Sequence, residues 1–257
     1  MRSVGHTGTL DPFATGLLIL LTGRATRLAR FIEQQSKTYL ATARLGFATS
    51  TDDRTGAPLG PEAGLGSVSA AQVRAAFQAM TGAQLQTPPA YSAKKVGGER
   101  SYRLARKGEA VTLAAVEVEL HEVELISFDP PLVTFRATVS AGTYIRAIAR
   151  DLGETLGVGA HLEALRREAI GAIRVEDATP LAELGEPPPL QSLGSVLGHL
   201  ERIDITAAEA DDVGHGRPVH RTGVGSEHTR LAYDGRMIGV ARTDGEWLRP
   251  VVVLEGK

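Results

Sequence analysis

The sequence predicts an α+β protein whose last part is a small β-barrel. Three segments rich in β-forming residues indicate strands, at 37–47, 111–128 and 132–140. Two further segments, 69–80 and the one that opens at 141–143, are typical of helices. Beyond residue 203, short β-type runs are separated by glycines, which is the pattern of a small barrel.

The composition is that of an ordinary globular protein. Of the 257 residues 42% are hydrophobic and 23% are charged, and the formal net charge is −2. A wholly disordered or collagen-like chain is therefore excluded. The length suits one large domain, or one large domain with a smaller companion.

Cysteine is absent from the sequence, which excludes disulfides, thiolate catalysis and cysteine-bound metal, and which suits a reducing cytoplasm. The longest aliphatic run, 17–21, is far shorter than the roughly 20 residues that cross a bilayer. The N-terminus has no signal-peptide pattern. We therefore expect a cytoplasmic protein that is not bound to a membrane.

The first elements of the chain follow from local pattern. The aliphatic run 17–21 lies between two glycines and predicts a buried strand. A helix over 24–34 follows, with apolar residues on one arc and three arginines on the opposite arc. After the strand 37–47, the stretch 49–66 is rich in Asp, Thr, Gly and Pro and predicts a loop.

In the second half of the chain, cap, turn and glycine residues mark where the predicted elements begin and end. Ser69 is a plausible N-cap for the helix 69–80, and a turn at 129–131 joins the two long strands into a hairpin. The helix after residue 143 carries an apolar face and ends at a pair of glycines. The proline-rich stretch 185–194 is the best candidate for a linker.

The net charge conceals a local basic segment. Residues 94–107 contain six basic residues and one acidic residue, a net charge of +5, and tyrosines lie at positions 91 and 102. A charge run is usually a solvated surface, but tyrosines are rare in this chain. Basic side chains with stacking aromatics suit RNA, because they bind phosphates and bases together.

The segment from Gly5 to Gly16, GHTGTLDPFATG, combines three glycines with an Asp-Pro step. It predicts an irregular loop that delivers Asp11 just before an apolar run. On the residues alone, Asp11 is a turn former, a nucleophile or a general base. The glycine spacing does not match a dinucleotide-binding fingerprint, and the chain contains no phosphate-binding P-loop pattern.

Four motifs in order resemble bacterial tRNA pseudouridine-55 synthases, which isomerise a uridine in the T-loop of tRNA. The first is GHTGTLDPFATGLL, at residues 5–18. The second starts at Lys37-Thr38-Tyr39, and the third contains Gly142-Thr143-Tyr144-Ile145-Arg146. The segment 88–95, PPAYSAKK, resembles the family's RNA-gripping segment, and residues 203–254 resemble its small RNA-binding barrel.

The resemblance implies a fold and a set of site residues. It implies a mixed, largely antiparallel sheet with flanking helices in a catalytic domain over 1–200, and a PUA-like RNA-binding barrel over 201–257. Asp11 is implied to be the catalytic aspartate, Tyr39 the active-site tyrosine and Arg146 the arginine that pairs with the aspartate. The remaining implied residues are His6, Tyr91, Lys94, Lys95 and Tyr102 for RNA, and Tyr144 and Leu165 for the pocket.

Elementary chemistry supports these roles. Exchanging a C–N glycosidic bond for a C–C bond requires an ionised carboxylate, and an arginine beside Asp11 lowers a carboxylate pKa by about 1–3 units. A tyrosine offers the base a flat face and a hydroxyl. A stacked uridine must leave its stack before it can react. Whether Asp11 attacks C6, attacks C1′ or removes a ribose proton stays open.

Each of these residues has a plainer interpretation. Tyr39 can be a half-buried strand residue, Arg146 a solvated residue of the first helical turn, and His6 an ordinary loop histidine. Two other functions stay open: a tRNA-binding protein of the same family with impaired catalysis, and a hydrolase that pairs Asp11 with a second carboxylate, for which the sequence indicates no partner.

The chain differs from the family in three places. Family members usually carry thirty or more residues before the first motif, including a Lys-Pro-x-Gly segment, so the catalytic domain is expected to be N-terminally incomplete. Ala141 stands where lysine is common, and Glu168 where threonine is common. We expect no cofactor and no metal, with tRNA as the partner of a monomeric enzyme.

Overall fold

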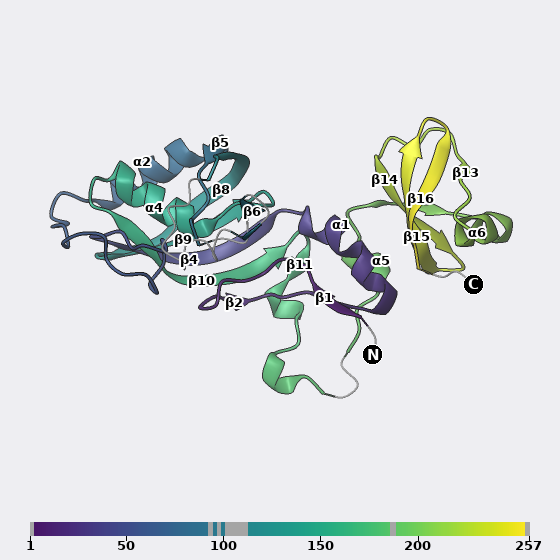
Figure 1. The fold of residues 1–257 in the computed structure, drawn as a ribbon, viewed down its shortest axis with the longest axis horizontal. Helices are drawn as coiled ribbons and strands as arrows, with labels where there is room; N and C mark the ends of the chain where they lie inside the picture. Colours follow the sequence, from purple (N-terminus) through teal and green to yellow (C-terminus); the bar gives the residue numbers. More distant parts are fainter. Residues whose placement is uncertain (1–2, 92–94, 97–98, 101–112, 186–188, 255–257) are drawn as a thin grey trace. The chain divides into compact units, whose positions relative to one another are not determined.

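The computed structural model describes residues 3–91, 95–96, 99–100, 113–185 and 189–254 (Figure 1). The chain forms two compact units. One contains residues 10–17 and 35–170, and is called the sheet unit here. The other contains residues 1–9, 18–34 and 171–257, and is called the split unit.

The sheet unit is built on a mixed sheet with the strand order β10-β4-β9-β8-β5. These neighbours pair antiparallel, and the short β2 pairs in parallel with β10. The strands are β2 (Thr15–Gly16), β4 (Lys37–Leu45), β5 (Gly82–Gln86), β8 (Val116–Asp129), β9 (Leu132–Val139) and β10 (Ala160–Ile170), with a small separate pair, β6 (Lys95–Val96) and β7 (Glu99–Arg100). The expected largely antiparallel sheet is confirmed.

Two helices, α2 (Ala70–Met80) and α4 (Ile145–Thr155), cover one face of this sheet (Figure 1). The predicted N-cap Ser69 accepts a hydrogen bond from the Gln72 amide and completes a capping box. Side chains of both helices share one apolar core with the inward faces of β4, β8 and β9. Because this core fixes the rotation of α4, it also fixes which way the first turn of α4 faces.

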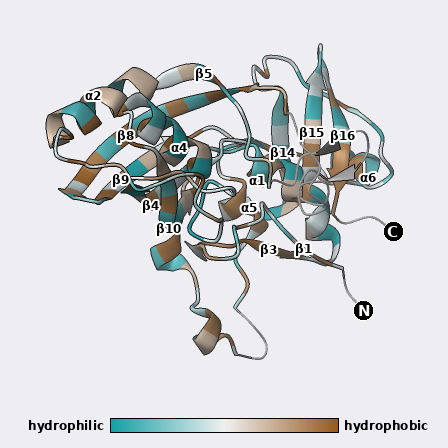
Figure 2. Ribbon diagram, turned by 60° about the vertical axis from the view of Figure 1, so that its left-hand side comes forward, coloured by the Kyte–Doolittle hydropathy of each residue, from teal (hydrophilic) through white to brown (hydrophobic). Residues whose placement is uncertain are grey.

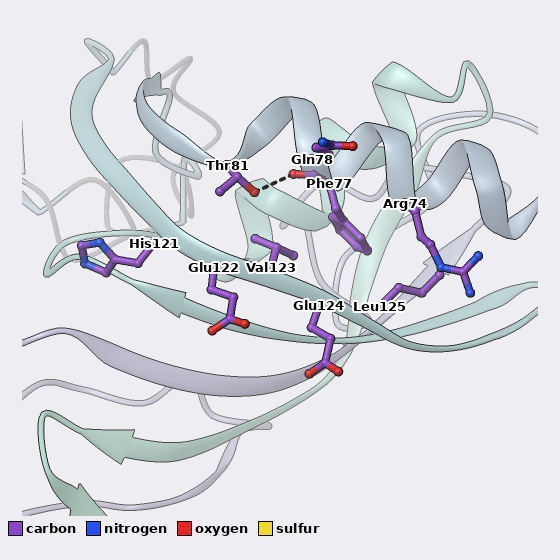
Figure 3. Close-up of a pocket in the computed structure, with 9 residues that line it drawn as sticks. All are labelled: Arg74, Phe77, Gln78, Thr81, His121, Glu122, Val123, Glu124 and Leu125. Carbon is purple, nitrogen blue, oxygen red and sulfur yellow. Dashed lines mark hydrogen bonds between the residues drawn. The ribbon is translucent and has the colours of Figure 1, made fainter.

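In strand β8, successive side chains point to opposite faces of the sheet. Val123 points toward α2, whereas Glu122 and Glu124 point to the opposite side of the sheet (Figure 3). Irregularities after Leu120 and Leu125 insert one extra residue each, so the strand keeps its apolar residues on the core side. A groove of about 420 Å³ lies between α2 and β8 and is lined by none of the predicted site residues.

One sequence expectation fails, and one strand of the sheet unit was not predicted. The aliphatic run 17–21 is not one buried strand, because Leu18 and Leu20 are exposed while Leu17 and Leu21 are buried. The eleven residues of β10 received no strand prediction. Their sequence, AHLEALRREAI, is rich in helix formers, and burial between β4 and β2 outweighs that preference.

The split unit joins an early part of the chain to its end. Strands β1 (Val4–His6) and β3 (Leu20–Thr22) pair antiparallel. The predicted helix 24–34 begins as a 3-10 helix, Gly23–Leu28, and continues as α1, Ala29–Glu33. Arg24 and Arg27 donate hydrogen bonds to the carbonyl oxygens of Leu254 and Val253, so these arginines bind the end of the last strand.

The C-terminal part of the split unit is a curled five-stranded sheet with the order β12-β14-β15-β16-β13, which fits a PUA-like domain. Its strands are β12 (Glu201–Asp204), β13 (Val219–His220), β14 (His228–Tyr233), β15 (Arg236–Asp244) and β16 (Trp247–Val253). Hydrophobic and hydrophilic residues both occur along β14, β15 and β16 (Figure 2). Helix α6 (Ala207–Gly214), which Thr206 caps, was not predicted.

Short elements connect the two parts of the split unit: β11 (Ile173–Arg174), the 3-10 turns Val175–Asp177 and Leu181–Glu183, and α5 (Leu193–Val196). The expected linker 185–194 thus contains the first residues of α5. In the described ranges no helix is long and apolar enough to span a bilayer.

Candidate active site

Asp11 lies on the loop that enters β2. The Ala14 amide donates a 2.9 Å hydrogen bond to the Asp11 carbonyl oxygen, which closes a turn after Asp11. The loop then continues into β2, where Thr15 and Gly16 pair with Arg166 and Arg167 of β10. The Asp-Pro step therefore delivers the carboxylate just before β2 at the edge of the sheet, and not before the strand expected at 17–21.

Arg146 brings three segments together from the first turn of α4. Its Nη2 atom donates to Oδ1 of Asp11 at 2.9 Å and to the carbonyl oxygen of Tyr91 at 3.0 Å. Its Nη1 atom donates to the carbonyl oxygen of Thr51 at 3.2 Å. The Arg146 side chain is 7% exposed, so the alternative of a solvated helix arginine is wrong. The predicted pairing of Asp11 with Arg146 is present in the geometry.

A second carboxylate approaches the same guanidinium. Oδ2 of Asp53 lies 3.5 Å from Nη1 of Arg146, and the Asp53 side chain is 7% exposed. Its Oδ1 atom accepts hydrogen bonds from the Thr51 hydroxyl at 2.7 Å and the Thr55 amide at 2.9 Å. The hydrolase alternative lacked a partner carboxylate in the sequence; the structure supplies one, but hydrogen bonds within its own loop hold it.

Burial dominates the electrostatics of Asp11. It raises the pKa of the Asp11 carboxyl above its usual value, and the charge and hydrogen bond of Arg146 oppose this rise while the charge of Asp53 adds to it. The arginine beside Asp11, taken alone, predicts a lowered pKa of this carboxyl. The pKa is raised instead, because the free-energy cost of removing the carboxylate from water exceeds the stabilisation that Arg146 gives to its charged form.

Tyr39 lies on the core side of β4 and is 9% exposed. Burial raises the pKa of its phenol, the charge and hydrogen bond of Arg167 oppose that rise, and the negative charge of Asp11 adds to it. The charges of Arg167 and Asp11 therefore act on the Tyr39 phenol in opposite directions.

The two predicted pocket residues are held in different ways. Tyr144 precedes α4 and is half-buried; its amide donates to the Gln86 side chain at 2.8 Å, and its carbonyl oxygen accepts from the same side chain at 3.2 Å. Leu165 of β10 is 7% exposed and belongs to the apolar core of the sheet unit. The pocket role of both residues stays a prediction.

The predicted RNA-binding residues are more scattered. His6 is exposed on β1 of the split unit, and Tyr91 presents its carbonyl oxygen to Arg146. Lys95 belongs to β6, but its side chain is outside the described part of the structure, and Lys94 and Tyr102 lie outside the described residues altogether. Their RNA contacts therefore remain predictions.

Sequence reasoning missed Asp53, Arg150 and Arg167. Arg150 supports the neighbouring loop, because its Nη1 donates to Oδ2 of Asp52 at 3.0 Å and its Nη2 to the Thr87 carbonyl oxygen at 3.1 Å. The signal available was the paired aspartates in the loop after β4. Among the described residues, no three His, Asp or Glu side chains lie together in a way that could hold a metal ion.

Three family models match successive parts of the chain. Residues 1–145 match the family model of the TruB family pseudouridylate synthase N-terminal domain. Residues 146–187 match the tRNA pseudouridylate synthase B C-terminal domain, and residues 200–255 match the C-terminal domain of tRNA pseudouridine synthase II.

Curated relatives resemble the chain over nearly its full length. The tRNA pseudouridine synthase B of Thermobifida fusca (strain YX) is 42% identical, covering 99% of this chain and 90% of the relative. The enzyme of the same name from Mycobacterium ulcerans (strain Agy99) is 41% identical, covering 98% and 86%.

Solved structures share the fold at lower identity. An H/ACA RNP bound to a substrate RNA containing 2′-deoxyuridine matches with a TM-score of 0.73 at 19% identity, over 98% of this chain and 76% of that chain. A Cbf5-Nop10-Gar1 complex matches with a TM-score of 0.73 at 21% identity, over 99% and 77%. The sequence matches and the shared fold together establish that the chain belongs to the TruB family of pseudouridylate synthases.

Proposed function

We propose that this chain uses Asp11, Arg146 and Tyr39 to convert uridine 55 in the T-loop of tRNA to pseudouridine. The broader activity follows from family membership: the chain is a pseudouridine synthase, an isomerase that acts on uridine in tRNA. The residue roles and the choice of position 55 are the proposal.

The 2.9 Å contact between Arg146 Nη2 and Asp11 Oδ1 carries the assignment. The reaction breaks the bond from C1′ to N1 of uracil, turns the base, and joins C1′ to C5. The C5 proton is then lost to solvent, and N1 takes up a proton in its place. Asp11 is a carboxylate on a loop, partly accessible, with a cation that favours its ionised form. It either attacks the nucleotide or removes a proton from it.

Tyr39 and Arg146 assist from the protein side. Tyr39, whose phenol the charge of Asp11 reaches, is assigned to stack against the detached base and to supply a hydroxyl for proton transfer. Arg146 orients the carboxylate, because its other hydrogen bonds tie it to the loop of Thr51 and to the segment of Tyr91. The arrangement is therefore rigid before substrate arrives.

Substrate access requires RNA binding and an extruded uridine. We propose that Tyr91, Lys94, Lys95 and Tyr102 bind the T-arm, and that His6 occupies the space the uridine leaves. The pocket for the base includes Tyr144 and Leu165. Monomeric state and cytoplasmic location belong to the same proposal.

The test is release of tritium from a T-arm stem-loop labelled at uracil C5 in position 55. We expect the wild-type protein to release tritium, and a stem-loop labelled only at other uridines to release none. No release from position 55 by a folded protein would overturn the proposal. Light scattering with and without the stem-loop gives the oligomeric state in the same samples.

The alternative is a tRNA-binding relative that has lost catalysis. It predicts that the stem-loop binds but that tritium is not released. The intact contact between Asp11 and Arg146 favours the enzyme, because a chain without turnover has no need to keep a buried arginine on a partly accessible carboxylate.

A further inference from the structure

Arg167 connects the two strands that carry the proposed site. In β10 it pairs with Tyr39 of β4 on one side and with Gly16 of β2 on the other. The strand that follows Asp11 and the strand that holds Tyr39 thus meet at a single residue. A Cβ atom at Gly16 would lie 2.2 Å from the Arg167 carbonyl oxygen, so the close approach on the β2 side requires glycine.

The Arg167 side chain is 1% exposed and is the largest fully buried side chain in the described structure. Its Nε atom donates a 2.8 Å hydrogen bond to the carbonyl oxygen of Leu17, and its own carbonyl oxygen accepts from the Leu17 amide at 2.9 Å. A buried guanidinium is costly unless its donors have partners. Leu17 provides one partner and fixes the direction in which the rest of the guanidinium points.

Arg167 and Tyr39 stand directly opposite each other in the antiparallel pair of β10 and β4, so their side chains lie on the same face of the sheet. The positive charge of Arg167 opposes the burial-driven rise in the pKa of the Tyr39 phenol. Arg146, which lies on α4 and not on the sheet, contacts the Asp11 carboxylate. The proposed site therefore has one arginine for its carboxylate and a different arginine for its phenol.

We propose that Arg167 is a positioning residue for the pseudouridine reaction, holding the Tyr39 hydroxyl in place while Leu17 holds Arg167. The proposal rests on the role proposed above for Tyr39. Arg167 is itself sealed from solvent, so it acts on the reaction through Tyr39 and contacts no substrate. The next residue back, Arg166, is exposed on the other face of β10 and offers a matched control.

The first experiment is a double-mutant cycle with tritium release from the T-arm stem-loop as the readout. We expect Arg167→Met to lower kcat about 10–100-fold and to change KM less than about threefold. In a Tyr39→Phe background, the same change should lower kcat less than about threefold, because the hydroxyl it serves is gone. Arg166→Met should leave kcat within about threefold of wild type.

Arg167→Lys keeps the test decisive if the methionine variant does not fold. Lysine retains the charge, but its single ammonium cannot reach Leu17 and Tyr39 together as the planar, forked guanidinium of arginine does. We expect a smaller loss of kcat, which again disappears in the Tyr39→Phe background. A loss of equal size in both backgrounds would show that Arg167 only supports the fold, and would overturn the proposal.

The second readout needs no substrate. Protein labelled with ¹³C at tyrosine Cζ gives one resonance per tyrosine, and Tyr39→Phe identifies that of Tyr39. Because Arg167 opposes the rise in the pKa of Tyr39, Arg167→Met should move its titration to higher pH, and Arg166→Met should not. An unmoved titration would overturn the proposal. Absence of tritium release by wild type would instead overturn the proposed function and leave this result standing.

Discussion

The Nη2 atom of Arg146 lies 2.9 Å from Oδ1 of Asp11, and its Nη1 atom lies 3.5 Å from Oδ2 of Asp53. One buried cation thus faces two carboxylates that differ in exposure, 27% for Asp11 and 7% for Asp53. The more accessible carboxylate is free to meet a substrate, while loop hydrogen bonds hold the other. This asymmetry suits Asp11 to the proposed reacting role and Asp53 to a supporting role.

Asp11→Asn should abolish tritium release and keep T-arm affinity within about tenfold, roughly 1.4 kcal/mol. The amide retains the shape of the side chain but cannot attack or accept a proton as a carboxylate does. Filter binding and tritium release on the same preparation measure the two quantities. Loss of binding together with turnover would assign Asp11 a structural role.

The same variant should not be less stable than wild type at neutral pH. The folded-state pKa of Asp11 is raised, so its contribution to stability is present below the unfolded pKa and is lost as the pH rises through the folded pKa. At pH 7 an uncharged amide removes this penalty. Urea unfolding of both proteins at pH 7 checks the sign, and a clearly lower free energy of unfolding for Asp11→Asn would contradict it.

Arg146→Met should destabilise the sheet unit by about 3–5 kcal/mol, because it leaves the buried Asp53 without its cation. Urea unfolding measures this cost. Adding Asp53→Asn should recover part of the stability, since the uncompensated charge is then gone. Tritium release should stay absent in the double variant, because Asp11 still lacks its orienting partner. Recovery of turnover would show that Arg146 serves Asp53 alone.

Asp53→Asn should move the acid limb of kcat/KM to lower pH. The negative charge of Asp53 contributes to the raised pKa of Asp11, so removing it lets Asp11 ionise at lower pH. The pH profile of tritium release at low substrate concentration measures the shift. Glu62→Gln is a suitable control, because Glu62 is an exposed carboxylate paired with Arg44 and should leave the limb in place.

Gly16→Ala should reduce both stability and turnover far more than Gly82→Ala. Both glycines have positive φ, +99° at Gly16 and +107° at Gly82, so both substitutions strain the backbone by about 1–2 kcal/mol. A Cβ atom at Gly82 meets nothing within 4 Å, whereas one at Gly16 meets the Arg167 carbonyl oxygen. Equal losses for the two variants in urea unfolding and tritium release would remove the special role of the β2–β10 contact.

The elements that the sequence predicted correctly are those whose signals are local. Ser69 and Gln72 form a capping box within four residues, and the alternation of β4 is visible along one strand. The failures are not local. Strand β10 consists of helix-forming residues and is held in place by β4 and β2, and Leu18 is exposed although its neighbour Leu17 is buried.

The same distinction applies to the site. Asp11, Tyr39 and Arg146 could be predicted because each lies in a recognisable motif. The upward shift in the pKa of Asp11 could not, because it depends on how much water the fold removes around the carboxylate. Arg167 was invisible as a partner of Tyr39, since only the register of two strands distant in sequence places them opposite each other.

The division of the chain has a consequence for its synthesis on the ribosome. The chain passes between the two units at residues 9–10, 17–18, 34–35 and 170–171. The segments on both sides of the Asp11 loop emerge early, yet they belong to a unit whose other residues, 171–257, emerge last. Strands β1 and β3 can pair as soon as both have emerged, but Arg24 and Arg27 must wait for the carbonyl oxygens of Leu254 and Val253. The segment that follows the loop of the proposed catalytic carboxylate therefore gains its last contacts only when translation is nearly complete.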